Sequence, residues 1–444
     1  MRQRTRIAAA AAIACALFVA GGVGLFHSLR TERPYDSSQA TVRSDALLAP
    51  VVTGSLNEII TSLQQRLRAL PTDWRSFASL GLAYVQEARV TADPSYYPKA
   101  QGVLQQSLKL DAADNFQAMV GMASLAAARH DFSGALNWGE KAKAINPYNG
   151  NVYGVIGDAQ VELGRYDDAF TTFQKMVDTL PSTASYARVS YARELMGDVP
   201  GAIGAMKQAL SFAGTPPDQA WASFQLGELY FNSGRLDKAA TAYRRGTEYD
   251  PTYIPARAGL AKVSWARGDV QRAIAGYTDV VAKYPSPEYV IALGDLYRVD
   301  GQPDQAARQY ALLHVEERLF LSAGVNLDLE FALFRAAHGD PHGALRAARQ
   351  EWHRRHSILV ADGYAWALYA NGDYREAALY ERRAMALGYR SALFDFHAGM
   401  IQLKLGNPEA AKRYLQKAVS TNPNFSILYA PTARRELARL GGGA

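Results

Sequence analysis

A turn motif that recurs at a nearly constant spacing constrains the fold of this 444-residue chain more than any other feature. Nine turns share this pattern and begin at His130, Gly164, Gly197, Gly234, Gly268, Gly301, Gly339, Gly372 and Gly406. An alanine stands five positions after every turn start, a coincidence that chance would give with a probability on the order of 10⁻⁷. A period of this length indicates a stack of similar helical or strand units rather than several unrelated domains.

Each unit is predicted to be a helix, a tight turn and a second helix. The turn glycine can adopt the left-handed conformation that ends a helix. Asp340-Pro341 and Asn407-Pro408 predict an N-cap followed by proline at the first helical position. The alanine after each turn, and a small residue seven positions before it, stand where two antiparallel helices must come close. The sequence therefore predicts an all-α fold.

The joint pattern resembles the tetratricopeptide repeat family. One unit carries the family's order of residues in Leu226-Gly227, Tyr230, Gly234, Ala239, Tyr243 and Pro251. The resemblance covers roughly four-fifths of the chain and implies a right-handed α-solenoid of about ten repeats over residues 74–425. A flanking helix is expected at 55–73, and a capping helix with a short tail at 426–444, because the end units of a solenoid need covers for their apolar faces.

The segment 1–30 has the composition of an export signal. Arg2, Arg4 and Arg6 precede an uncharged stretch from Ile7 to Phe26. This apolar stretch is long enough to cross a hydrocarbon layer of about 30 Å, so an uncleaved anchor and a cleaved signal peptide both remain open. Residues 31–54 are interpreted as a linker. In either case residues 31–444 are expected on the extracytoplasmic side, in the cell envelope, because flanking arginines stay in the cytoplasm.

The location of the charges argues against a nucleic-acid-binding protein. The formal net charge is +6, but the segment 1–30 contributes four arginines and no acidic residue, which leaves a net charge of +2 for the rest. The basic excess thus indicates membrane topology, and no nucleic-acid partner is expected. Cys15, in the same segment, is the one cysteine, so the repeats contain neither a disulfide nor a thiol nucleophile.

In the family that the chain resembles, the first helix of each pair lines an inner groove. Placing the family's inward positions on this chain gives a candidate partner-binding groove of Asp158, Tyr191, Trp221, Phe224, Glu228, Phe231, Lys262, Trp265, Asp295, Arg298, Trp366 and Tyr369. Aromatic side chains beside a few charges are typical of surfaces that bind a peptide or a partner helix. The competing interpretation is that these residues belong to the core between repeats.

No stretch of the sequence points to catalysis or to a cofactor. The phosphate-binding, zinc-protease and serine-hydrolase motifs are absent, and the repeats leave no room for a catalytic domain. Four histidines lie within 338–356, but His342 and His353 are separated by about 16 Å of predicted helix, so no metal site is expected.

The chain is therefore interpreted as a non-catalytic scaffold that binds an unidentified protein. The alternative is a carbohydrate- or envelope-polymer-binding module, because aromatic faces also stack on sugar rings.

Two irregularities interrupt the repeat. An insertion from Arg89 to Lys99 is expected either to project Tyr96 and Tyr97 as a loop that grips a partner, or to be only a longer loop. The step from Gly301 to Gly339 is longer than the steps on either side of it. There the second helix is expected to extend, or to be kinked, because Arg318 stands in place of the closing proline.

Overall fold

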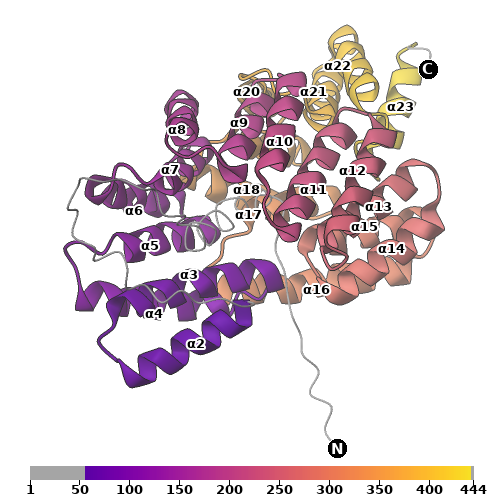
Figure 1. Ribbon diagram of the computed structural model, residues 1–444. Helices are drawn as coiled ribbons and strands as arrows, with labels where there is room; N and C mark the ends of the chain where they lie inside the picture. Colours follow the sequence, from indigo (N-terminus) through magenta and orange to yellow (C-terminus); the bar gives the residue numbers. More distant parts are fainter. Residues whose placement is uncertain (1–55, 442–444) are drawn as a thin grey trace, which may run out of the picture.

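The computed structural model describes residues 56–441, and in this range it contains 22 α-helices and no strand. The helices follow one another as antiparallel pairs wound into a solenoid (Figure 1). Helix α2 (Leu56–Ala69) precedes the pairs and α23 (Tyr429–Arg439) follows them. The prediction of an all-helical solenoid is confirmed. The predicted signal or anchor at 1–30 and the linker at 31–54 lie outside the described residues.

Ten helix pairs make up the solenoid. The first helices of the pairs are α3 (Trp74–Thr91), α5 (Phe116–Ala128), α7 (Gly150–Glu162), α9 (Thr183–Leu195), α11 (Pro216–Asn232), α13 (Ile254–Ala266), α15 (Pro287–Val299), α17 (Asp328–Ala337), α19 (Ile358–Ala370) and α21 (Ala392–Lys404). The second helices are α4 (Tyr96–Leu110), α6 (Phe132–Ile145), α8 (Tyr166–Thr179), α10 (Val199–Phe212), α12 (Leu236–Tyr249), α14 (Val270–Lys283), α16 (Pro303–Ser322), α18 (Pro341–Arg354), α20 (Tyr374–Ala384) and α22 (Pro408–Thr421). Each helix packs most closely on its partner in the pair, as a helix–turn–helix unit requires.

The turn and contact positions of the repeat behave as predicted. All eight turn glycines are left-handed, with φ between 72° and 90°, and His130 takes the same conformation with φ 60°. The nine alanines after the turns are all buried, with at most 3% of their surface exposed. A Cβ added at Gly227 would lie only 2.3 Å from the ring of Tyr243 on the partner helix. The small residues therefore set the distance between the two helices of a pair.

The two predicted N-caps of the form Asp-Pro and Asn-Pro differ. Asp340 Oδ1 accepts a hydrogen bond from the backbone N–H of Gly343 at 2.8 Å, as a capping residue does. Asn407 makes no capping hydrogen bond and instead donates to Gln402 Oε1 at 2.9 Å. Proline nevertheless stands at the start of both helices, so the helix boundaries agree with the prediction.

Both irregularities of the repeat lengthen a helix. α16 has 20 residues and is continuous through Arg318, which explains the long step between Gly301 and Gly339. α3 extends to Thr91, and Ala92 ends it in a left-handed conformation with φ 55°. The prediction of a protruding Tyr96-Tyr97 loop is wrong, because both tyrosines belong to α4 and Tyr97 is buried. The insertion therefore lengthens α3, and Ala88 and Tyr97 on either side of the connection are buried in the same cluster.

The solenoid goes once around and then packs against its own beginning. Figure 1 shows the long helix α16 returning beside α3, and apolar side chains of both belong to one buried cluster. Hydrogen bonds join residues almost 200 positions apart. They are Tyr284 Oη to Arg89 O (3.2 Å), Ile358 N to Tyr166 Oη (2.7 Å) and Asn422 Nδ2 to Phe231 O (2.9 Å). We call this contact between the first and second turns of the superhelix the seam.

A buried group of charges lies at the seam. Arg355, with 1% of its surface exposed, donates from Nη1 to Glu162 Oε2 of the first turn at 2.6 Å. Its Nε donates to Glu351, one helical turn earlier in the chain. Burial alone would raise the pKa of Glu351, but Arg355 and Arg354 outweigh it, and the pKa lies below its ordinary value. The arginine thus holds a carboxylate from each turn of the superhelix.

Turn glycines on the seam tolerate less change than those away from it. Gly197 and Gly268 have similar φ values, 75° and 86°, but a Cβ at Gly197 would lie 2.3 Å from the backbone oxygen of Gly388 across the seam. A Cβ at Gly268 would meet nothing within 4 Å. Both alanine variants should lose about 1–2 kcal/mol for the left-handed conformation. Gly197→Ala should lose about 1–3 kcal/mol more through overpacking.

Urea unfolding followed by circular dichroism measures both losses. Equal losses for Gly197→Ala and Gly268→Ala would show that the seam contact adds nothing to the stability of the turn.

Candidate functional site

The first helices of the pairs form the inner layer of the solenoid. α7 buries 12 of its 13 residues, whereas α8 buries only Ala169, Phe173 and Met176. A helix that is covered on all sides lies inside a structure, and a helix with a single buried stripe lies at its surface. The predicted groove residues all belong to first helices, so the structure places them on the inner layer.

Burial separates the twelve predicted groove residues into three groups. Five are buried, namely Asp158, Trp221, Phe231, Asp295 and Trp366. Six are partly exposed, namely Tyr191, Phe224, Glu228, Lys262, Trp265 and Tyr369. Arg298 is exposed. The five buried residues contribute to packing between repeats, so contact with a partner depends on the other seven. Their role in binding stays a prediction.

The partly exposed residues of α11 and α13 meet around one ion pair. Lys262 Nζ lies 2.7 Å from both carboxylate oxygens of Glu228, and the ammonium stands 4.5 Å from the centre of the Phe231 ring. Tyr243 Oη donates to Glu228 Oε1 at 2.5 Å from the outer helix α12. Lys262 thus joins two other predicted groove residues, Glu228 and Phe231. The hydrogen bond from the buried Tyr243 fixes the position of the Glu228 carboxylate.

Two further glutamates stand close to this ion pair. Burial, reinforced by the charge of Glu228, raises the pKa of Glu194 to about 7. Burial and Glu228 also raise the pKa of Glu288 to about 7, against the attraction of Lys262. Neither side-chain carboxyl group makes a hydrogen bond or ion pair with another residue in the range 56–441. The inner wall here holds three carboxyl groups and one ammonium.

Glu288 is absent from the predicted groove, although the sequence contained a signal for it. It stands thirteen positions before the turn glycine Gly301, as Trp221 stands thirteen positions before Gly234. The repeat frame alone therefore places Glu288 on the inner layer. We call Phe224, Glu228, Lys262, Trp265 and the two glutamates the central wall.

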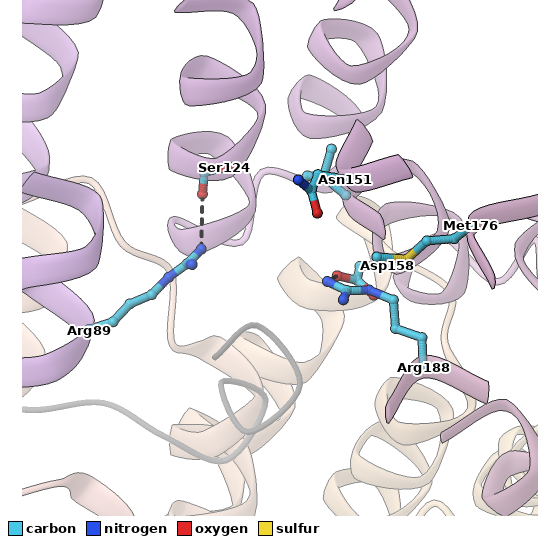
Figure 2. A pocket seen from close by; sticks show the side chains of 7 residues that line it. Arg89, Ser124, Asn151, Asp158, Met176 and Arg188 are labelled. Atoms are coloured by element: carbon cyan, nitrogen blue, oxygen red, sulfur yellow. Dashed lines mark hydrogen bonds and ion pairs between the residues drawn. The ribbon is translucent and has the colours of Figure 1, made fainter. Parts of the chain in front are cut away.

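A second polar region lies on the inner layer nearer the N-terminus (Figure 2). A small hollow that is open to solvent is lined by Arg89, Ser124, Asn151, Val155, Asp158, Met176 and Arg188. Arg188 donates to Asp158 through two bonds, from Nε at 2.9 Å and from Nη2 at 2.6 Å. Both members of this pair are buried, so it connects α7 to α9 firmly and supports one side of the hollow.

The C-terminal end of the inner layer is aromatic. The rings of Trp366 and Tyr369 stack with centres 4.5 Å apart and planes inclined by 6°. Trp366 Nε1 donates to Tyr429 Oη of the capping helix α23 at 3.0 Å. Nearby, Asp295 Oδ1 lies 2.7 Å from Tyr310 Oη and 2.8 Å from His338 Nε2. Trp366 and Asp295 thus have partners within the chain, and Tyr369 and Arg298 are the accessible members of this region.

The structure places the clustered histidines apart and assigns two of them to packing. His338 pairs with Asp295, and the ring of His356 stands edge-on to Trp352 at 4.6 Å. Among residues 56–441 no three histidine, cysteine or acidic side chains are grouped as a metal site would require.

None of the helices α2 to α23 is both long and apolar enough to cross a membrane.

Comparison with known proteins agrees with the repeat. The family profile described as tetratricopeptide repeat matches residues 220–253, 259–318 and 396–425. The cellulose synthase 1 operon protein C of Komagataeibacter xylinus is 26% identical over 199 residues, which cover 43% of this chain and 14% of that protein. The match thus spans about a seventh of the relative's length.

Two solved structures are similar at low identity. A tetratricopeptide repeat protein from Thermus thermophilus is 21% identical with a TM-score of 0.37, covering 48% of this chain and all of that one. The human IFIT1 dimer is 14% identical with a TM-score of 0.47, covering 74% of this chain and 77% of that one. The three profile matches show tetratricopeptide repeats at residues 220–253, 259–318 and 396–425, and the turns and helix pairs of the structure continue the same helix–turn–helix unit from α3 to α22.

Proposed function

We propose that the protein is a non-catalytic scaffold that binds a segment of a partner protein along its inner layer. The observation that supports this proposal is the central wall, where partly exposed aromatic and charged side chains of four successive repeats lie side by side. Aromatic anchors supply much of the binding energy at protein interfaces. The three carboxyl groups against one ammonium favour a segment that carries positive charge.

Removing two aromatic anchors should abolish partner capture. The full chain, tagged at its C-terminus and crosslinked in its native host, is expected to retain its partner. Phe224→Ala combined with Trp265→Ala should reduce the captured partner by about 30-fold or more, which corresponds to a combined loss of about 2 kcal/mol from two anchors that each cost about 1 kcal/mol. Quantitative mass spectrometry of the crosslinked material measures this ratio. Tyr148→Ala, which removes a loop tyrosine with 86% of its surface exposed, is the matched control.

The double variant must also be shown to be folded, because Phe224 packs against the rings of Tyr243 and Tyr253. Circular dichroism and the unfolding midpoint provide that check. Capture of the same partner by a folded double variant at the level of Tyr148→Ala would contradict binding at the central wall.

The alternative function is binding of a carbohydrate or envelope polymer. Its support is the name of the relative, which associates that protein with a cellulose synthase operon, and the stacked pair Trp366 and Tyr369. Binding of the same variants to cellulose and other envelope polysaccharides separates the two functions. Loss of polysaccharide binding in Tyr369→Ala, with protein capture unchanged in the central-wall variant, would favour the alternative.

We also propose that residues 31–444 act outside the cytoplasm, in the cell envelope. The support is the order of charged and apolar residues in 1–30. Mass determination of the N-terminus of the protein from its host distinguishes a retained anchor from a cleaved signal peptide. Recovery of the intact chain in the cytoplasmic fraction would contradict export.

A further inference from the structure

Four titratable side chains from three consecutive helices lie buried together near the C-terminal end of the solenoid. They are Asp362 of α19, Glu381 of α20, and Asp395 and His397 of α21, and none has more than 4% of its surface exposed. We call them the carboxyl cluster. Three carboxyl groups in one buried place are costly unless each is paired or neutral.

Pairing within the cluster is incomplete. Asp362 Oδ1 lies 2.8 Å from His397 Nδ1, and Asp395 Oδ1 accepts from Lys417 of α22 at 2.9 Å. Neither carboxyl oxygen of Glu381 has a hydrogen-bond partner, and Asp395 Oδ2 and His397 Nε2 also lack one within the range 56–441. Glu381 is therefore the member whose negative charge nothing in this range compensates.

The surroundings of Glu381 favour its neutral form from every side. Burial, and then the charges of Asp362 and Asp395, hold the pKa of Glu381 well above its ordinary value. Lys417 contacts Asp395, and Arg383 of the same helix lies over the rings of Trp352 and Tyr380. Across the seam, the carboxyl group of Glu194 in α9 acts on Tyr389, which precedes α21. Arg390 lies at the seam beside Gly197.

The cluster touches the aromatic end of the inner layer directly. The ring of His397 stacks on Trp366 with centres 4.1 Å apart and planes inclined by 15°. Trp366 in turn stacks on Tyr369 and is hydrogen bonded to Tyr429 of the capping helix. The ring of His397 also stands edge-on to Tyr429 at 6.0 Å, so a change in the charge or packing of the cluster is one contact away from both Trp366 and α23.

We propose that the carboxyl cluster is a pH-sensitive switch, in which loss of the proton held by Glu381 loosens α20 from α19 and α21 and displaces Trp366 and Tyr369. The direction in which the stability of the fold changes with pH follows from proton linkage. A carboxyl group that binds its proton more tightly in the folded chain stabilises the fold fully at low pH and less as the pH rises above about 4.5. The switch therefore holds this end of the solenoid closed in acid and releases it toward alkaline pH. It does not depend on what the groove binds.

Unfolding of the full chain in urea at pH 5 to 9 tests the switch. The ratio of the unfolding equilibrium constants of the native chain and Glu381→Gln should grow with pH by up to tenfold per unit, until the proton is lost from the folded chain. Glu376→Gln, an exposed glutamate of the same helix, should show no such growth. Equal pH dependence of the Glu381 and Glu376 variants would overturn the proposal.

A spectroscopic measurement separates a switch from a purely structural role. With 5-fluorotryptophan incorporated, the Trp366 resonance, assigned with Trp366→Phe, should shift with pH in the native chain and not in Glu381→Gln. If Glu381→Gln does not fold, Asp395→Asn gives a second test, because it removes a like charge and leaves Lys417 nearby. Its Trp366 transition should move to lower pH. A Trp366 resonance that does not respond to pH would also overturn the proposal.

Discussion

Replacing Arg355 by alanine is expected to lower the free energy of unfolding by about 3–5 kcal/mol, the cost of breaking a buried ion pair from one side. The guanidinium has 1% of its surface exposed and contacts carboxylates of both superhelical turns, Glu162 and Glu351. Without it both carboxylates remain buried, and the cation left beside them in the described part of the chain is Arg354, which contacts Glu351. Urea titration followed by circular dichroism measures the loss.

Arg346→Ala, which removes an exposed arginine of the preceding helix α18, is the control and should change stability by less than about 0.5 kcal/mol. The pH dependence gives a second criterion. Because the pKa of Glu351 is lowered in the folded chain, its contribution is full above about pH 4.5 and is lost as the pH falls through the folded value. The difference between Arg355→Ala and the native chain should therefore shrink in acid. A loss no larger than that of Arg346→Ala would show that the charges do not hold the seam.

Tyr243→Ala should also destabilise the chain by about 3–5 kcal/mol, the cost of removing a large buried ring that neighbouring residues cannot replace. Tyr243 is fully buried, and its ring fills the space over Gly227 and Gly259, where an added Cβ would lie 2.3 Å and 2.5 Å from it. The ring joins α12 to α11 and α13, so its loss opens a cavity between two repeats. Chemical denaturation measures this effect as well.

Tyr243→Phe keeps the ring and removes only the hydroxyl that donates to Glu228. It should cost about 1.5–3 kcal/mol, the net value of one hydrogen bond to a charged group. The two variants separate packing from positioning of the groove carboxylate. If alanine and phenylalanine gave the same loss, the ring would not be the element that holds these repeats together.

The local structure of each repeat could be predicted from the sequence because it depends on residues close together in the chain. A left-handed turn residue and an alanine between two helices are requirements of a few neighbouring atoms, and the structure meets them in all nine units that carry the turn motif. His130 shows that the turn needs a left-handed residue rather than a glycine as such. The Tyr96-Tyr97 prediction failed because composition alone does not show whether an insertion forms a loop or lengthens a helix.

The seam could not be predicted in the same way. Its hydrogen bonds join residues 191 to 195 positions apart, such as Phe231 with Asn422 and Arg89 with Tyr284. Whether a solenoid meets itself depends on small rotations between successive repeats, summed over almost six of them, and no motif encodes that sum. The buried ion pair at the seam could not be predicted either, because no sequence pattern connects Glu162 with Arg355.

The sequence predicted where the groove residues lie better than it predicted how exposed their side chains are. The repeat frame identified the inner layer, and the structure brings Glu228, Lys262 and Phe231 into contact there. It also buries Trp221 and Trp366, because large rings fill the gaps between helices that small residues leave. Side-chain exposure depends on the residues of neighbouring repeats, which a single-repeat pattern does not include.

The seam also limits how an array of this kind could grow or shrink. In a solenoid whose units touch only their neighbours, one unit can be inserted or deleted and the remaining contacts survive. Here a unit added between Tyr166 and Ile358 would carry every later residue out of register with its partner in the first turn, and Arg355 would no longer meet Glu162. The seam contacts thus fix the number of repeats per superhelical turn, and a duplicated repeat would preserve them only outside the interval that the seam spans.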